Sequence, residues 1–275
     1  MAQGWDTLVE IDGDVMQALA CTFGKKGSIL ERGGMRGTRQ HNVNDAAAGP
    51  YRVNGPITVE PSNGGLYDLA VLVIGASDLL TAVAITVDRD TAAFDYAACC
   101  IDKLTISGSQ GGLIQAVVEP IGTTEAAGSA LAAPASSVPV AYSDVLLTIG
   151  AVTCTPQSFE LRIDNDLDAD RFLNSQTVTL NSASSMDARD RIVTLRAVVP
   201  YDSTHTSLYD MALAGMAGTL TVGTVVFTFG ILQVPAESPP IGGKGEVYLT
   251  LNLQAKKTGS TADIAVSGGG GGSGA

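Results

Sequence analysis

Alternation of apolar and polar residues is the clearest pattern in this chain, and two segments show it best. Residues 158–164 read S-F-E-L-R-I-D, and residues 246–255 read E-V-Y-L-T-L-N-L-Q-A. A period of two places the apolar side chains on one face of a strand and the polar side chains on the other. Both segments are therefore predicted to be half-buried strands. The first runs into D-N-D-L-D-A-D, whose short acidic and amide side chains favour a turn.

Further apolar segments predict that strands dominate the whole chain. Strands are expected at 53–60 (interrupted by Gly55-Pro56), 84–87, 94–107, 145–149, 177–180 and 192–199. Residues 103–107 and 113–119 flank a glycine-rich turn and predict a hairpin, as does 219–229, which breaks at Gly223. Helical spacing covers Leu66 to Ile74, with Asn63 as the cap and Gly75 as the stop. A second short helix is expected at 207–214.

The ends of the chain read differently from its middle. Residues 24–49 are rich in glycine and basic side chains and offer little periodic apolar surface, which indicates an extended arm or long loop. Residues 122–139 are mostly Ala, Ser, Gly and Pro and indicate another loop. We therefore expect an N-terminal arm at 1–50, one β-sandwich domain at 51–266 with one or two short flanking helices, and a flexible glycine-rich tail at 267–275.

Composition narrows the classes of function. The chain has 275 residues, a net charge of −12 and only 16% charged residues, and this acidic balance argues against a surface that binds nucleic-acid phosphates. A local basic cluster at Lys25, Lys26, Arg32, Arg36 and Arg39 lacks interleaved aromatic residues, so a solvated loop or a subunit contact is favoured over nucleic-acid binding. No segment resembles a secretory signal or a membrane span, which predicts a soluble protein made in the cytosol.

Candidate chemistry is sparse. The cysteines, Cys21, Cys99, Cys100 and Cys154, have no metal or redox spacing and are expected to be reduced, buried side chains. His41 and His205 stand in separate loop-like segments, and neither Asp202 nor Ser203 beside His205 completes a catalytic signature. No catalytic residue, cofactor or metal ligand is predicted, so the chain is not expected to be an enzyme.

Two segments match only part of a ligand-binding motif. Asp166, Asp168 and Asp170 match the first ligand positions of an EF-hand loop, but Arg171 replaces the required glycine and Thr177 the closing glutamate. Residues 242–245 read G-G-K-G, yet a phosphate loop needs Ser or Thr after the lysine and a helix beyond it. Both segments are interpreted as turns.

Three passages together carry a resemblance. They are residues 94–122, the stretch S-F-E-L-R-I-D-N-D-L from 158, and residues 239–255, which reads P-P-I-G-G-K-G-E-V-Y-L-T-L-N-L-Q-A. Their order and spacing resemble the tail tube (major tail) proteins of long-tailed, siphovirus-type bacteriophages over roughly residues 50 to 266.

The resemblance implies a β-sandwich subunit that forms hexameric rings, which stack into a tube that conducts DNA during ejection without binding it specifically. The implied partners are further copies of the chain, a tape-measure protein, and baseplate and tail-terminator proteins. The implied location is the virion tail, assembled in the host bacterial cytoplasm and not in a membrane. Long loops and arms commonly make the contacts between rings in that family.

Two groups of residues are the candidate sites. Acidic residues on or after the 158–164 strand are candidates for the lumen or for contacts between subunits: Glu160, Asp164, Asp166, Asp168 and Asp170. The basic cluster from Lys25 to Arg39 and the loop at 122–139 are candidates for ring-to-ring contacts. An acidic lumen would repel DNA in transit. The alternatives are another virion decoration or adhesion β-sandwich, and an enzyme or carbohydrate binder on a jelly-roll frame, for which the single Trp5 is a poor aromatic platform.

Overall fold

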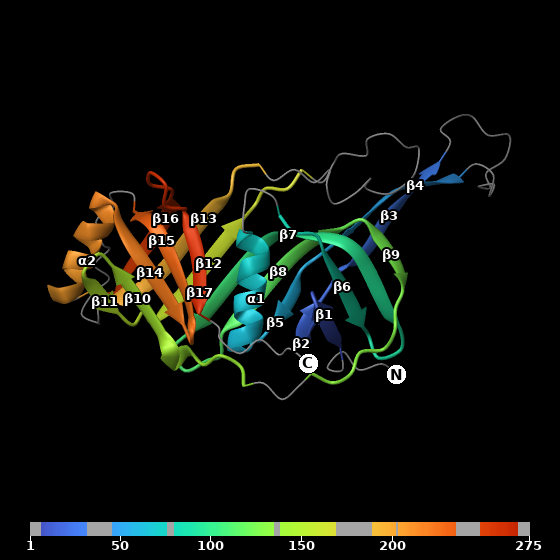
Figure 1. The fold of residues 1–275 in the computed structure, drawn as a ribbon, viewed down its shortest axis with the longest axis horizontal. Coiled ribbons are helices and arrows are strands. Elements are labelled where there is room, and N and C mark those ends of the chain that lie inside the picture. The colour runs from blue at the N-terminus through green and yellow to red at the C-terminus, as the bar shows by residue number, and fades with distance from the viewer. Residues whose placement is uncertain are drawn as a thin grey trace.

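A computed structural model describes residues 7–31, 46–75, 80–134, 138–168, 189–201, 203–234 and 248–268. The fold is mainly β, as the alternation predicted (Figure 1). The strands are β1 (Leu8–Ile11), β2 (Asp14–Cys21), β3 (Gly24–Glu31), β4 (Ala46–Asn54), β5 (Ile57–Val59), β6 (Val83–Asp88), β7 (Ala93–Ser109), β8 (Gln115–Gly122), β9 (Thr124–Ala127), β10 (Val145–Ile149), β11 (Val152–Cys154), β12 (Ser158–Asp164), β13 (Ile192–Pro200), β14 (Met216–Val222), β15 (Val225–Gln233), β16 (Tyr248–Lys256) and β17 (Ile264–Gly268). The helices are α1 (Asn63–Ile74) and α2 (Ser203–Ala214).

A closed barrel occupies one end of the molecule. Its six strands pair in the cycle β1–β6–β7–β8–β5–β2 and back to β1, every pair antiparallel. Buried side chains such as Val9, Ile85 and Val87 are fully enclosed. Because the barrel is closed, each of these strands has a partner on both sides, and this protects the barrel from pairing with strands of other chains.

A second sheet continues from the barrel through β7. Strand β12 pairs with the second half of β7, followed by β13, β16 and β15, while β14, β10, β11 and β17 complete this part of the fold. The alternation in β12 is visible in burial, because Phe159, Leu161 and Ile163 are buried and Glu160 and Arg162 are exposed. The same core continues into the barrel.

Strand β7 belongs to both parts. Its first residues pair with β6 and β9, and its later residues pair with β8 and β12. Ala98 lies where the pairing changes and has a φ of 51°, an uncommon left-handed value for a residue with a side chain. The register also shifts between Ile101 and Lys103. These irregularities bend one continuous strand from the barrel into the second sheet.

Helix α1 packs on β7, β15 and β17 between the two parts of the fold (Figure 1). Its N-cap is Ser62, whose hydroxyl accepts a hydrogen bond from the backbone N–H of Gly65 at 3.3 Å. The predicted cap, Asn63, instead accepts a hydrogen bond from the backbone N–H of Thr224. Gly75 ends the helix as predicted, with a φ of 68°.

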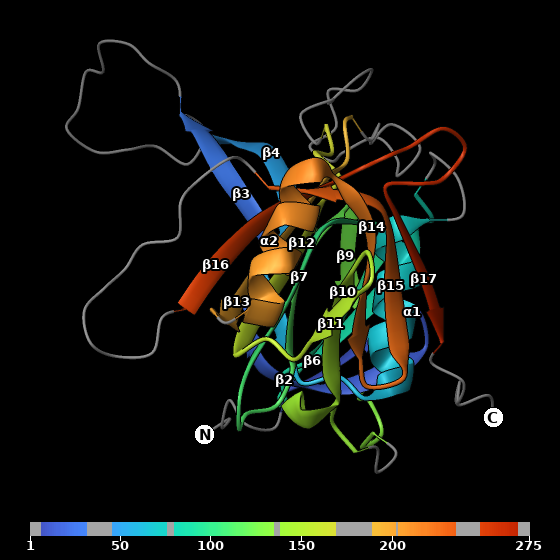
Figure 2. The ribbon, with the colours of Figure 1, turned by 90° about the vertical axis from the view of Figure 1, so that its left-hand side faces the viewer.

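Helix α2 covers the far end of the second sheet and contacts β10, β11 and β15. It begins four residues earlier than the predicted 207–214. At the opposite end of the long axis, β3 and β4 form a hairpin that projects beyond the barrel (Figures 1 and 2). The two ends of the molecule are therefore built from different elements.

Several local expectations differ from the structure. Residues 24–31 and 46–49 were expected to lie in an arm or loop, but they belong to the paired strands β3 and β4, because the backbone ladder compensates for their weak apolar pattern. Strand β9 lies in the expected loop at 122–139, and β17 reaches into the expected tail at 267–275. The predicted strand at 177–180 lies outside the described residues. The expected domain limits stay a prediction, although β1 and β2 share the barrel with β5 to β8.

The cysteines are free, as expected from their spacing. Cys99, Cys100 and Cys154 are buried, and Cys21 is half-buried. Burial raises the pKa of the Cys99 thiol to about 12. A thiol that is protonated and enclosed at neutral pH acts as a small apolar side chain.

Candidate functional site

The exposed face of β7, β12 and β13 carries alternating charges. Glu160 in β12 lies opposite Arg196 in β13, and Asp164 lies opposite Lys103 in β7. Lys103 also lies opposite Glu119 in β8. Opposite charges on neighbouring strands attract, and each such pair contributes about 0.2–1 kcal/mol. The face is therefore polar but balanced in charge, unlike the strongly acidic chain as a whole.

Asp164, at the end of β12, is held by two cations. Its Oδ2 lies 3.1 Å from Lys103 Nζ and 2.8 Å from Arg162 Nη2. Burial acts to raise the pKa of Asp164, but hydrogen bonds from Lys103, Arg162 and the Asp166 backbone outweigh it and lower that pKa. The hydrogen bond to Asp164 in turn raises the pKa of Lys103. Asp164 is thus a charged anchor for the strand end.

Asn165 connects the acidic turn to the rest of the fold. Only 2% of this residue is exposed, and its amide donates to Val73 O at 3.0 Å and to Ile101 O at 3.2 Å. Val73 lies in the last turn of α1, where carbonyl groups lack helical partners. The turn therefore binds the C-terminal end of the helix and the middle of β7 at once.

Two further contacts fix the same junction. The Asp102 carboxylate accepts a hydrogen bond from the backbone N–H of Leu167 at 2.8 Å, and burial raises the pKa of Asp102 despite that bond. Arg191 donates to Ile74 O at 2.8 Å and forms a bidentate pair with Asp263. The positive charge of Arg191 also interacts favourably with the negative, C-terminal end of the helix dipole.

The acidic residues of the turn face a cation of the chain itself. Arg189 Nη2 lies 3.2 Å from Asp168 Oδ2, and Arg189 Nη1 lies 4.0 Å from Asp166 Oδ2. Asp170, the third of the expected acidic run, lies outside the described residues. Within the part of the chain that the structure describes, no group of three or more His, Cys, Asp and Glu side chains could hold a metal ion. The turn is therefore a neutralised structural junction, and its expected excess of negative charge is reduced by Arg189, Lys103 and Arg162.

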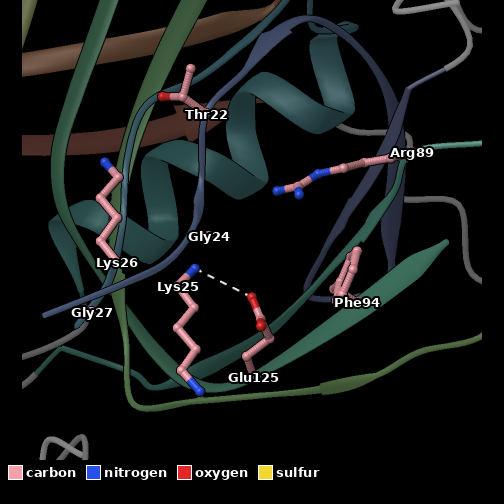
Figure 3. A pocket seen from close by; sticks show the side chains of 8 residues that line it. All are labelled: Thr22, Gly24, Lys25, Lys26, Gly27, Arg89, Phe94 and Glu125. Carbon is pink, nitrogen blue, oxygen red and sulfur yellow. Dashed lines mark hydrogen bonds between the residues drawn. The ribbon is translucent and has the colours of Figure 1, made fainter. Parts of the chain in front are cut away.

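The described part of the basic cluster lies beside a surface pocket at the base of the β3–β4 hairpin. The pocket has a volume of about 550 Å³, and Figure 3 shows its lining. Its lining residues are Thr22, Gly24, Lys25, Lys26, Gly27, Arg89, Phe94 and Glu125. Arg32, Arg36 and Arg39, the other members of the predicted cluster, lie outside the described residues.

Contacts in and beside the pocket position two of its basic residues, Lys25 and Arg89. The Lys25 ammonium stands 3.9 Å from the centre of the Tyr51 ring, and the Lys25 backbone N–H donates to Glu125 at 3.3 Å. Arg89 donates to Phe23 O at 2.7 Å and lies 5.3 Å from the Phe94 ring. Cations over aromatic rings retain an attraction of about 0.5–1 kcal/mol at exposed sites. The pocket is thus lined by three basic residues, one carboxylate and the Phe94 ring, with the side chains of Lys25 and Lys26 pointing in opposite directions (Figure 3).

Tyr96 lies next to Gly24, one of the residues that line the pocket. It is 1% exposed, and its ring packs at 4.7 Å between centroids against Phe23. Burial, and then the nearby Glu125 carboxylate, raise the pKa of its phenol. Gly24 leaves room here, since a Cβ at that position would stand 3.2 Å from Arg89 Nη2 and 3.5 Å from the Tyr96 hydroxyl.

Sequence reasoning missed Arg89, Phe94 and Glu125. Each is isolated in the sequence, and they come beside Lys25 only because β9 pairs with β7 next to the β3–β4 hairpin.

The other candidate groups do not converge on a site. His41, Asp202 and residues 242–245 lie outside the described residues, and His205 lies in α2 without a described side-chain position.

Among the described residues, the sheet that carries the charged face ends in β3 at one edge and in β16 at the other. Strands β3, β4, β8, β7, β12, β13 and β16 pair in that order. Strand β16 pairs with β13 on one side, while on its other side β15 reaches only Gln254 to Lys256. Among the described strands, none pairs with the second side of residues 249–253. An exposed edge of this kind is able to accept a strand from another chain.

Among the described helices, none is long and apolar enough to cross a membrane.

A search of the curated proteins finds no significant match to this chain. A family model described as "Phage tail tube protein" matches residues 6–255, nearly the whole chain. This match agrees with the mainly β fold, the closed barrel and the flanking helix. The chain belongs to the family of phage tail tube proteins.

Proposed function

We propose that this protein is the repeating subunit of a phage tail tube that assembles as stacked hexameric rings and conducts DNA during ejection. Membership of the family makes it a structural component of the virion tail. The observation that best supports ring formation is the second side of β16 at residues 249–253, with which none of the described strands pairs. A neighbouring subunit that added a strand there would extend the sheet from one subunit to the next.

The charged face of β7, β12 and β13 is our candidate for the channel lining. Glu160 and Asp164 would repel DNA phosphates, while Arg196 and Lys103 directly opposite them limit the net negative charge. A face with balanced charge releases few counterions on contact with DNA, so it gives little sequence-independent affinity. DNA would pass such a wall without adhering. Asp166, Asp168 and Asp170 remain candidates for contacts between subunits.

The β3–β4 hairpin is our candidate for contacts between rings. It projects from the body (Figure 2), and its described basic residues Lys25, Lys26 and Arg52 are exposed. The partners at the two ends of the tube would be baseplate and tail-terminator proteins, with a tape-measure protein inside. Assembly would take place in the host cytoplasm, and no enzymatic step or cofactor is part of this function.

Electron microscopy of the purified full-length protein tests this function. Rings or tubes with a central channel are expected, together with no retention of duplex DNA at physiological salt in a gel-shift assay. Particles that remain monomers at every concentration and salt tested would instead favour a decoration or adhesion module, the alternative β-sandwich function. Tubes that bind DNA tightly would overturn the proposed channel lining but leave the tube itself standing.

A further inference from the structure

The two ends of the molecule differ in the charged residues that they present. Lys25, Lys26 and Arg89 line the pocket at the hairpin end, with Glu125 as its one acidic residue. At the other end of the long axis stands α2 (Figure 1). Between Arg196 and Lys244 the sequence contains Asp202, Asp210 and Glu237 but neither lysine nor arginine. Within α2 itself the sequence has one charged residue, Asp210, and neither lysine nor arginine.

The exposed surface at α2 combines a carboxylate with apolar side chains. Asp210 is exposed, and Leu213, three residues later on the same helix, is 39% exposed. Residues three apart on a helix lie on the same face. Tyr201 before the helix and Met216 after it are also exposed, at 39% and 40%. Exposed apolar residues near a charge are typical of a surface that contacts another protein.

The pocket has the complementary chemistry. Its basic side chains can donate charge-assisted hydrogen bonds to a carboxylate, and the half-buried Phe94 ring provides apolar area beside them. Figure 3 shows the Arg89 side chain reaching toward the middle of the group that lines the pocket. Arg89 is held there by its bond to Phe23 O, so little side-chain entropy is lost on binding.

The geometry points to a head-to-tail contact in which the Asp210–Leu213 face of α2 in one copy docks into the Lys25–Lys26–Arg89 pocket of a second copy. This inference rests on the proposed function, because it assumes that the chain self-assembles. Two different surfaces at opposite ends of one molecule make a heterologous contact, which generates rings or filaments and not a closed pair. Asp210 is the bound carboxylate, and Arg89 and Lys26 are its expected partners.

Charge reversal and its rescue test the contact in the full-length protein. The variants are K25E/K26E, D210K, and the triple variant that combines them. The first two place like charges opposite each other and are expected to raise the concentration needed for assembly at least about tenfold. The triple variant restores opposite charges and is expected to return assembly to within about threefold of wild type. Light scattering measures the concentration, and electron microscopy identifies the assembled form.

Matched controls separate this contact from a general effect of charge. Lys257→Glu reverses an exposed lysine after β16, and Asp68→Lys reverses an exposed aspartate on α1, so both are expected to assemble as wild type does. Circular dichroism checks that each variant keeps the fold. Arg89→Gln serves as a second probe of the pocket and is expected to weaken assembly without adding a negative charge.

The outcomes distinguish failure of this contact from failure of the proposed tube function. Wild-type protein that never assembles overturns both the proposed function and this contact. If wild type assembles and D210K does so equally well, or if the triple variant is no better than either parent, the contact fails while the tube subunit stands. Binding of inorganic polyphosphate to the pocket, with assembly unchanged in all variants, would likewise overturn the contact and leave an anion site of another kind.

Discussion

The side-chain amide of Asn165 donates a hydrogen bond of 3.0 Å to the carbonyl oxygen of Val73, and this contact joins the turn after β12 to the last turn of α1. The same amide also reaches Ile101 O in β7. One buried side chain thereby connects a helix end, a shared strand and the acidic turn. A neutral residue therefore helps to hold a segment whose sequence is notable for its charges.

Replacing Asn165 tests this junction. Asn165→Ala leaves the carbonyl oxygens of Val73 and Ile101 without this donor in a buried site, which should lower the free energy of unfolding by about 1–3 kcal/mol. Urea denaturation followed by circular dichroism measures the change. Gln254→Ala, on the exposed face of β16, is the control and should change stability by less than about 0.5 kcal/mol. A loss no larger than that of the control would show that Asn165 does not hold the junction.

Arg191 and Asp263 should be energetically coupled. Arg191→Met removes the pair and the bond to Ile74 O, while Asp263→Asn removes only the charge of the partner. A double-mutant cycle should give a coupling energy of about 1 kcal/mol, more than isolated surface pairs usually give, because the geometry is bidentate and partly buried. Thermal or urea unfolding of the four proteins supplies the values. Additive effects would show that the two side chains lie close together without being energetically coupled.

Asp164 is expected to stabilise the fold at neutral pH. Its folded pKa lies below its unfolded value, so its contribution is complete above the unfolded pKa near 3.8 and is lost as the pH falls through the folded pKa. Asp164→Asn should therefore cost about 1 kcal/mol at pH 7 and progressively less as the pH drops below 3.8. Stability curves between pH 7 and pH 3 check the sign. A cost that grows on acidification would contradict the assignment.

Asp102 should behave in the opposite sense. Burial raises its folded pKa above the value of 3.8, so the charged form costs stability as the pH rises through that raised pKa. Asp102→Asn keeps an oxygen for the Leu167 N–H and should gain stability at pH 7 relative to wild type. The gain should disappear at pH below 3.8, where Asp102 is protonated in both states. The same pH series used for Asp164→Asn compares the two variants directly.

Gly55 is required by the turn between β4 and β5. Its φ is 140°, and a Cβ there would stand 2.5 Å from the backbone oxygen of Thr22. Gly55→Ala should cost about 3 kcal/mol, since strain and a backbone clash add. Gly111→Ala is the matched control, because Gly111 also has a positive φ, of 83°, but no atom within 4 Å of the added Cβ. It should cost about 1 kcal/mol. Equal losses would mean that strain alone matters at Gly55.

Local pattern predicted the elements with strong alternation. β12 and β13 begin and end close to their expected limits, because one face of each strand is buried and the other is wet. β9 was not predicted because Thr124 to Ala127 carries almost no apolar signal, and pairing with β7 alone makes it a strand. Barrel closure depends on contacts such as Leu8 with Asp88, far apart in the sequence, and period alone carries no information about them.

The site was predictable only in part. Composition marked Lys25 and Lys26 as a basic group, but Arg89 is an isolated arginine whose position depends on how β6 and β7 turn beside the hairpin. The acidic turn was recognised as acidic, yet Lys103 and Arg189 lie distant in the sequence and reach it only in the fold. The resemblance to tail tube proteins was confirmed because it rested on the order of several segments and not on one motif.

Strand β7 is a single length of backbone shared by the barrel and the second sheet. Because its hydrogen bonds serve both parts, neither part is able to come apart without loosening the other, and the molecule should unfold in one transition. Such a strand also transmits tension. A pull on one half of the subunit runs along the covalent bonds of β7 into the other half, so the subunit resists stretching as one mechanical unit.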